Sequence, residues 1–305
     1  MYDIIVIGGG ASGMTAALYA LRASKSVLIL EKENFGGQIA TSPRVENFPS
    51  IKTMSGLEFS DNLFAQIDAL GVAFELDTAL KIQKQGDIFV VEGEYNTYEA
   101  RSVIIANGVK HRKINVEGED ELIGHGVSYC ATCDGAFFKD QETFVIGDAN
   151  SALQYALLLA NYSPKVNLIT LFGKFFADDI LIRRIKENDK IVVHDNWNLV
   201  ELKQNNGELQ GLVFENRLNK ELKKEFKASN VFIAIGQIPD NERFSNLVEL
   251  EKGYILTDED MATKTEGVFA CGDTKKKGMR QLVTACNDGA IAAMSAIRYI
   301  DTLDI

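Results

Sequence analysis

Cysteine and histidine are scarce in this 305-residue sequence, and their scarcity argues against a structural zinc site. There is one close cysteine pair, Cys130 and Cys133, whereas a zinc site needs a second pair of cysteine or histidine ligands at short spacing. Cys271 and Cys286 stand alone, and the three histidines are scattered. We therefore expect no bound metal, and we interpret Cys271 and Cys286 as small buried residues.

Long apolar runs and an excess of basic residues are also missing. The longest apolar runs are short strand-like pieces such as residues 4–7, which cannot cross a bilayer. The 32 lysines and arginines are outnumbered by 43 aspartates and glutamates, whereas a nucleic-acid-binding protein needs a basic face to displace counterions. The first residues enter a strand without a secretory signal. We expect a cytoplasmic protein with neither a membrane nor a nucleic acid as partner.

The segment Cys130-Ala131-Thr132-Cys133-Asp134 carries the clearest chemical signal. Two cysteines separated by two residues can close a small, readily reduced disulfide, and the acid after them can move the proton that thiol chemistry requires. Because the cytoplasm keeps ordinary thiols reduced, such a pair is more often catalytic than structural there. We predict a redox-active disulfide, with Cys130, Cys133 and Asp134 as catalytic residues.

A glycine-rich turn follows the first expected strand, residues 2–7, and precedes an expected helix. In this context Gly8 permits the tight turn, Gly10 lets the backbone approach a pyrophosphate, and Gly13 allows close packing of helix on strand. Glu31 ends the next strand, where an acid can bind a ribose hydroxyl. The motif predicts a dinucleotide site but does not choose between FAD and NAD. The polar stretch 36–49 suits a larger cofactor, or is an ordinary surface loop.

The same strand–turn–helix layout recurs from residue 143, but it lacks residues that bind a dinucleotide in the first copy. A strand over residues 143–146 leads into a turn where Ala149 replaces the glycine that meets the phosphate, so a methyl group stands in the way. Asp148 adds negative charge beside it. After the next strand, residues 166–169, the sequence offers Thr170 instead of an acid for NAD or arginines for NADP. We predict a domain that keeps the fold and has lost the ligand.

Past Pro239 the pattern returns to the first domain, with a strand delivering Asp273 and a final helix opening after Met279. The length also suits two domains. The predicted fold class is α/β, with two three-layer Rossmann-like dinucleotide-binding domains, the second inserted in the first. The expected domain ranges are 1–114 and 243–305 for the outer domain and 115–242 for the inserted one.

Five motifs in order give the chain its family resemblance: residues 8–13, 36–38, 45–49, 130–134, and 268–273 with 280–281. Together they resemble the low-molecular-weight thioredoxin reductase family. The resemblance implies FAD, a homodimer, and thioredoxin as the oxidised substrate. It implies that Cys133 faces the flavin, that Cys130 attacks the thioredoxin disulfide, that Asp134 is the acid/base, and that Asp273 lies near the ribityl-phosphate region.

The predicted FAD-binding residues, from the glycine turn and the matched motifs, are Gly8, Gly10, Ala11, Ser12, Gly13, Glu31, Lys32, Gly37, Gln38, Asn47, Gly108, Asp273, Arg280, Gln281 and Leu282.

One departure from the family concerns the electron donor. Members that use NADPH carry an intact second glycine motif. After the following strand they also carry a His-Arg-Arg run and a further arginine, and those four positions are Thr170, Leu171, Phe172 and Phe176 in this sequence. Each lost arginine–phosphate contact is worth roughly 1.5–3 kcal/mol, so we predict that NADPH is not the donor.

The sequence best resembles the ferredoxin-dependent flavin thioredoxin reductases of anaerobic bacteria, which lack pyridine-nucleotide motifs. That resemblance implies reduced ferredoxin as the donor. Ferredoxins are generally acidic, and Lys275-Lys276-Lys277 is the candidate docking surface, or else a solvated loop. Two alternatives remain: another donor, either reduced deazaflavin or NAD(P)H, and a flavin redox sensor that does not turn over. The complete segment from Cys130 to Asp134 disfavours the sensor.

Overall fold

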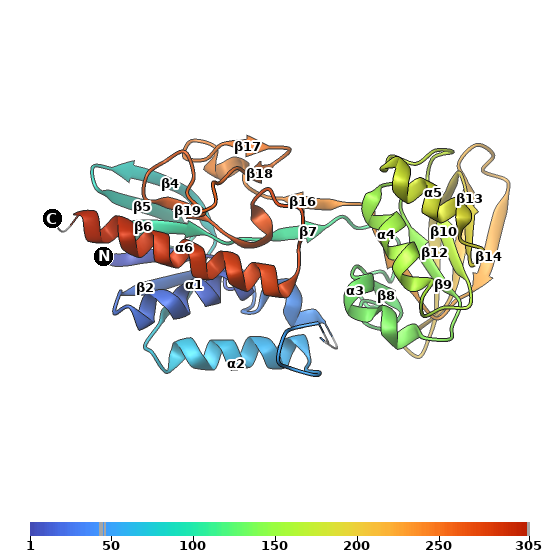
Figure 1. Ribbon diagram of the computed structural model, residues 1–305, viewed down its shortest axis with the longest axis horizontal. Coiled ribbons are helices and arrows are strands. Elements are labelled where there is room, and N and C mark those ends of the chain that lie inside the picture. Colours follow the sequence, from blue (N-terminus) through green and yellow to red (C-terminus); the bar gives the residue numbers. More distant parts are fainter. Residues whose placement is uncertain (43–44, 46, 304–305) are drawn as a thin grey trace. The chain divides into compact units, whose positions relative to one another are not determined.

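The computed structural model describes residues 1–42, 45 and 47–303, which form two compact units (Figure 1). The first unit joins Met1–Lys110 to Ile238–Ile305, and the second is His111–Gln237. These boundaries lie four and five residues before the expected ones at 114/115 and 242/243. The connecting strands β7 (Val109–His111) and β16 (Gln237–Pro239) pair with each other. None of the described helices has the length and apolar character needed to span a membrane.

The first unit is built on a mixed sheet with the order β3-β2-β1-β6-β5-β4, and β19 pairs with β6. Its pairings β2–β3, β1–β2, β1–β6 and β6–β19 are parallel, whereas β4–β5 and β5–β6 are antiparallel. The strands are β1 (Tyr2–Ile7), β2 (Val27–Glu31), β3 (Ala73–Leu76), β4 (Ala79–Gln85), β5 (Ile88–Gly93), β6 (Thr97–Ile105) and β19 (Val268–Ala270). The helices and short pieces are α1 (Ala11–Arg22), η1 (Gly37–Thr41), α2 (Gly56–Asp68), η3 (Glu242–Phe244), β17 (Leu250–Glu251), β18 (Tyr254–Ile255), η4 (Gly272–Thr274) and α6 (Leu282–Leu303).

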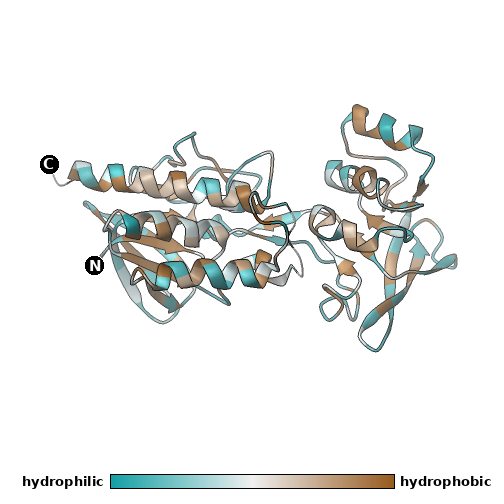
Figure 2. Cartoon of the chain, turned by 60° about the horizontal axis from the view of Figure 1, so that its bottom comes forward, coloured by the Kyte–Doolittle hydropathy of each residue, from teal (hydrophilic) through white to brown (hydrophobic). Residues whose placement is uncertain are grey.

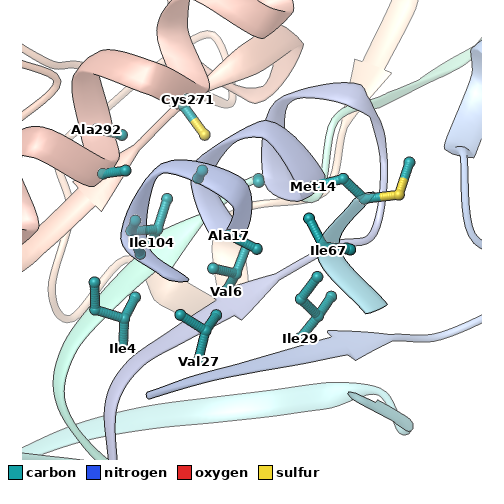
Figure 3. Close-up of a cluster of buried hydrophobic side chains, with 14 of the residues drawn as sticks. Ile4, Val6, Met14, Ala17, Val27, Ile29, Ile67, Ile104, Cys271 and Ala292 are labelled. Carbon is teal, nitrogen blue, oxygen red and sulfur yellow. The ribbon is translucent and has the colours of Figure 1, made fainter. Parts of the chain in front are cut away.

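Strand β1 is central because its last four residues, 4–7, are buried on both faces of the sheet, as four consecutive apolar residues predict. Ile4 and Val6 point into the layer that contains α1, α2 and α6, where they meet Met14 and Ile104 (Figure 3). Ile5 and Ile7 belong to the core on the opposite face of the sheet. This burial fixes the carboxyl end of β1, and therefore the glycine turn that follows it.

The second unit repeats the strand–turn–helix design around a parallel sheet with the order β11-β10-β9-β15-β8. An antiparallel sheet, β12-β13-β14, packs in the same unit, and Trp197 is buried in its core. The elements are β8 (Val127–Ser128), α3 (Ala131–Asp134), η2 (Gly135–Phe138), β9 (Thr143–Ile146), α4 (Asn150–Leu159), β10 (Val166–Ile169), α5 (Asp179–Glu187), β11 (Ile191–His194), β12 (Trp197–Asn205), β13 (Glu208–Asn216), β14 (Lys223–Lys227) and β15 (Val231–Ile233).

The predicted α/β class with Rossmann-like sheets is confirmed in both units. Hydropathy follows the layers: the central strands are mostly apolar, and the turns and exposed helix faces are polar (Figure 2). Helix α5 was not predicted from the sequence, although its apolar positions Leu181 and Ile185 are spaced four residues apart on one face.

Candidate active site

Cys130 and Cys133 form a disulfide in the second unit, with their Cα atoms 5.3 Å apart. Cys130 is the N-cap of the short helix α3, and Cys133 lies in the helix. The backbone N–H of Cys133 donates a hydrogen bond to Sγ of Cys130 at 3.2 Å. A donor in this position stabilises negative charge on Sγ, so it favours Cys130 as a thiolate once the disulfide is reduced.

The carboxylate of Asp134, at the end of α3, lies beside this pair. The hydroxyl of Ser128 donates to Oδ2 of Asp134 at 2.7 Å. The other oxygen, Oδ1, is buried and accepts no hydrogen bond from any described residue. Burial raises the pKa of Asp134, and the hydrogen bond from Ser128 partly opposes that rise. A carboxyl group with a raised pKa keeps its proton to a higher pH than a solvent-exposed one, which suits it to proton transfer.

The chain just before Cys130 is held by a partly buried network of contacts that could not be predicted from the sequence. The hydroxyl of Tyr155, on α4, donates to the carbonyl oxygen of Tyr129 at 3.1 Å. The Tyr129 hydroxyl donates to Glu119 at 2.5 Å, and the ring of His111 stacks on the Tyr129 ring with centroids 4.9 Å apart. Burial lowers the pKa of His111 to about 4, so this histidine is neutral at physiological pH. The network fixes the backbone that enters the disulfide.

In the first unit, the glycine turn between β1 and α1 has the geometry of a dinucleotide site. Gly8 has φ +107°, and a Cβ on Gly13 would lie 1.9 Å from the carbonyl oxygen of Gly8, so both positions require glycine. A Cβ on Gly10 would meet nothing closer than 3.8 Å, which leaves open space in front of the turn. Among the described residues, no side chain caps the N-terminus of α1. Glu31 accepts the N–H of Gly9 at 2.7 Å and thereby ties the end of β2 to the turn.

Hydrogen bonds join the other predicted cofactor-binding segments to this turn or to one another. The Gly36 N–H donates to the carbonyl oxygen of Gly9 at 2.8 Å, and the Gln38 side chain donates to the carbonyl oxygen of Val109, next to Gly108. Asn47 donates to Oε1 of Gln281 at 3.1 Å, which joins the loop at residues 45–49 to the segment before α6. Glu46, in that loop, lies outside the described residues. Lys32 and Gly108 line a small hollow in the same unit, and Leu282 begins α6.

Asp273, in η4, contributes a partly buried carboxylate to the same unit, and its Oδ1 atom is buried. Its Oδ1 accepts no hydrogen bond from the described residues, and the nearest cation is Nζ of Lys277 at 3.6 Å. Burial raises the pKa of Asp273, while Lys277 and Arg280 act in the opposite direction. The guanidinium of Arg280 stacks on the Tyr254 ring at 4.3 Å. A buried carboxylate oxygen without a donor is suited to accept a hydrogen bond from a ligand hydroxyl.

The comparisons with known proteins agree with a disulfide in the second unit and a dinucleotide-type turn in the first. The family model for pyridine nucleotide-disulphide oxidoreductases matches residues 2–289. A thioredoxin reductase of Bacillus subtilis is 40% identical over 304 residues, covering 99% of this chain and 96% of the relative. One from Listeria monocytogenes is 36% identical, with coverages of 99% and 95%. The chain belongs to the thioredoxin reductase family. A solved thioredoxin reductase structure from Streptococcus pyogenes has a TM-score of 0.93 at 36% identity, and each chain is covered to 99%.

Thioredoxin reductases use FAD, and the first unit fits this cofactor. The space before Gly10 and the uncapped start of α1 suit a pyrophosphate, because backbone N–H groups there face an anion without a competing side chain. The orphaned Oδ1 of Asp273 provides an acceptor for a sugar hydroxyl. When bound, FAD supplies the ability to take up electrons singly and to deliver them as a pair.

The corresponding turn of the second unit is closed by its own chain. The backbone N–H of Phe176 donates to the carbonyl oxygen of Asp148 at 2.8 Å, and Phe176 forms a bridge with Ala149. The Asp148 carboxylate accepts the N–H of Phe172 at 3.3 Å. Burial raises the pKa of Asp148, and the neighbouring Asp195 raises it further. The segment that follows β10 in this member of the family therefore folds back onto the turn between β9 and α4.

The cations near this turn are stacked on aromatic rings. Arg217 lies 4.2 Å from the centroid of the Phe172 ring, and Nζ of Lys174 lies 4.9 Å from that of Phe176. The Thr170 hydroxyl bonds to Oδ1 of Asp195 at 2.7 Å, which places a carboxylate at the end of β10. A phosphate approaching this edge meets negative charge and aromatic rings instead of an arginine cluster.

The sequence left the lysine run Lys275-Lys276-Lys277 as either a docking surface or a solvated loop, and only Lys276 of the three is exposed. Lys275 is buried, with Nζ 3.0 Å from Sδ of Met261. Lys276 forms an ion pair of 2.6 Å with Glu251. Lys277 is largely buried and pairs with Asp288 at 2.8 Å. Each ammonium group has a partner 11 to 25 residues away in the sequence, so the three lysines do not form one continuous basic patch.

Proposed function

We propose that this protein is a cytoplasmic, homodimeric, FAD-dependent thioredoxin-disulfide reductase whose electrons come from reduced ferredoxin instead of NADPH. The observation that carries the disulfide chemistry is the Cys130–Cys133 disulfide with Asp134 beside it. In this proposal, FAD held by the glycine turn and Asp273 would supply the electrons from ferredoxin to the disulfide, where Cys133 receives them and Cys130 reacts with thioredoxin. The family membership and the fit of the first unit to FAD support the flavin step.

The proposed chemistry balances over two electrons and two protons. Two electrons, one from each of two ferredoxins, and two protons convert the disulfide into two thiols. The Cys130 thiolate then attacks the thioredoxin disulfide, forming a mixed disulfide and releasing one thioredoxin sulfur as a thiolate. The Cys133 thiolate attacks Sγ of Cys130, which restores the enzyme disulfide and releases the second thioredoxin sulfur. Asp134 passes protons from the enzyme thiols to the departing thiolates.

The closed turn of the second unit supports a donor other than NADPH. Binding NADPH there would require the segment around Phe172 and Phe176 to leave its hydrogen bonds to Asp148. It would also require phosphate oxygens to approach Asp148 and Asp195 without a compensating arginine pair. Losing several contacts of roughly 1.5–3 kcal/mol each lowers affinity by several orders of magnitude.

The donor is tested by following the flavin absorbance of the purified protein under anaerobic conditions. We expect NADPH to leave the flavin oxidised for minutes, and reduced ferredoxin to bleach it within the mixing time of a manual experiment, followed by thioredoxin reduction. The matched control is the B. subtilis relative under the same conditions. Rapid bleaching by NADPH would show that the second unit opens and would overturn the donor proposal. Bleaching by reduced deazaflavin alone would replace ferredoxin and leave the reductase intact.

The fit of Asp273 to FAD leads to a second prediction. If a sugar hydroxyl of FAD donates to the orphaned Oδ1, the change Asp273→Ala should weaken FAD binding by roughly 10- to 100-fold, as expected for the loss of a charged hydrogen bond. The dissociation constant is measured from flavin fluorescence during reconstitution of the apoprotein. Asp260→Ala, which removes a surface partner of Arg298, is the control. Equal FAD affinity in the two variants would contradict the assignment.

A further inference from the structure

Ser128 makes two hydrogen bonds that connect the acid to the disulfide. Its hydroxyl donates to Oδ2 of Asp134 at 2.7 Å, and the same oxygen accepts the backbone N–H of Cys130 at 3.0 Å. A hydroxyl has one hydrogen to donate and lone pairs to accept with, so both bonds can form at once. Ser128 is buried at the end of β8, where pairing with β15 fixes its backbone.

We propose that Ser128 is a positioning residue for thiol–disulfide exchange: it holds the Asp134 carboxylate against the Cys130 backbone and sets the pH range in which Asp134 exchanges its proton. This inference rests on the proposed reductase function and adds a residue to it. The hydroxyl needs no contact with the reacting sulfurs, because it acts through Asp134 and the Cys130 amide.

The groups packed around Asp134 leave the ionisation of its carboxyl group strongly dependent on Ser128. The helix α3 packs against α4 and η2. The titratable side chain of α4 is Tyr155, whose own pKa is raised by burial and by Asp134. The sequence of η2, Gly-Ala-Phe-Phe, has no titratable side chain. With Oδ1 lacking a donor among the described residues, the hydroxyl of Ser128 is the main stabiliser of the ionised carboxylate.

The sign of the effect follows from this arrangement. Burial disfavours the ionised form and raises the pKa of Asp134, whereas the hydrogen bond from Ser128 favours the ionised form and lowers it. Removing the hydroxyl therefore moves the pKa further upward. The limb of the pH–rate profile that Asp134 controls should move to higher pH, whether its step requires the carboxylate as base or the carboxylic acid as donor.

The experiment compares Ser128→Ala with Ser128→Thr, which keeps a hydroxyl, and with Ser163→Ala, a buried serine hydrogen-bonded to Thr143 away from the disulfide. The FAD-loaded proteins are reduced anaerobically with dithionite and mixed with oxidised B. subtilis thioredoxin between pH 5 and 9. Independently, infrared difference spectra against Asp134→Asn follow protonation of this carboxyl in the oxidised enzyme. Thermal unfolding is recorded for each variant to confirm that it folds.

We expect Ser128→Ala to shift both the infrared titration and the controlled limb upward by about one pH unit, because a hydrogen bond to a charged group is worth about that much. Ser128→Thr should restore most of the shift, Ser163→Ala should show none, and combining Ser128→Ala with Asp134→Asn should abolish it. An unshifted infrared titration in a folded Ser128→Ala variant would overturn the inference. Failure of the wild type to reduce thioredoxin would instead count against the proposed function, and the infrared result would still decide the role of Ser128.

Discussion

Replacing Cys130 by serine should abolish thioredoxin reduction while leaving the flavin able to accept electrons. The variant lacks the thiolate that attacks the partner disulfide, and a serine hydroxyl is a far weaker nucleophile at neutral pH. We expect the rate of thioredoxin reduction to fall at least about a thousandfold. The measurement is steady-state thioredoxin reduction with ferredoxin or dithionite as electron source, together with anaerobic flavin reduction by dithionite.

Cys133→Ser provides the matched variant for the division of labour between the two cysteines. The N–H of Cys133 donates to Sγ of Cys130, so the structure favours Cys130 as the attacking thiolate. With Cys133 replaced, the mixed disulfide between Cys130 and thioredoxin has no thiol to resolve it and should accumulate as a covalent adduct. Cys286→Ala, which alters a free cysteine of the first unit, should behave like the wild type. Normal turnover by Cys130→Ser would show that Cys130 is not the attacking cysteine. A covalent adduct formed only by Cys130→Ser would show that the two cysteines have the opposite roles.

Gly289→Ala should cause the largest loss of stability among the substitutions considered for the first unit. Gly289 lies where α6 crosses α1, and a Cβ there would stand 2.1 Å from the carbonyl oxygen of Ser12. Because the clash is with backbone, a side-chain rotation cannot relieve it, and the two helices must separate. The displaced residue, Ser12, lies in the first turn of α1, directly after the glycine turn, and is one of the residues predicted to bind FAD. We expect a cost of about 3–5 kcal/mol, at the upper end for overpacking, and loss of bound FAD.

The control for this substitution is Gly278→Ala. A Cβ on Gly278 would meet no atom within 4 Å, and its backbone does not require glycine. Denaturant unfolding followed by circular dichroism should separate the two variants, and the flavin that remains bound after gel filtration should be depleted only in Gly289→Ala. A Gly289→Ala protein with the wild-type unfolding midpoint would show that α1 and α6 do not pack this closely.

Part of the architecture could be predicted because its causes are local. The strand β1 is apolar at successive positions, the turn after it needs the backbone freedom of Gly8, and Gly13 must lack a side chain to pack beneath it. Each requirement is expressed within a few consecutive residues. The disulfide was predictable for the same reason, since Cys130 and Cys133 are separated by two residues and lie close in any compact conformation.

The environment of the three lysines at residues 275–277 could not be predicted in this way. Lys275, Lys276 and Lys277 differ in nothing but position, yet one is buried against a methionine and the other two pair with Glu251 and Asp288. Those partners come from elsewhere in the sequence. Whether a cation is free or held depends on which distant groups the fold brings to it, and three consecutive lysines carry no information about that.

The sequence by itself determined the fold class, the dinucleotide-type glycine turn, the redox disulfide and the loss of the second nucleotide motif, because these depend on residue type and short spacing. Only the tertiary structure decided that Ser128 joins Asp134 to Cys130, that Tyr155 holds the carbonyl of Tyr129, and that Phe176 closes the turn at Asp148. These contacts join side chains and backbone from different elements, so they exist only once the sheets and helices have packed. Burial then sets how strongly each polar group needs its partner.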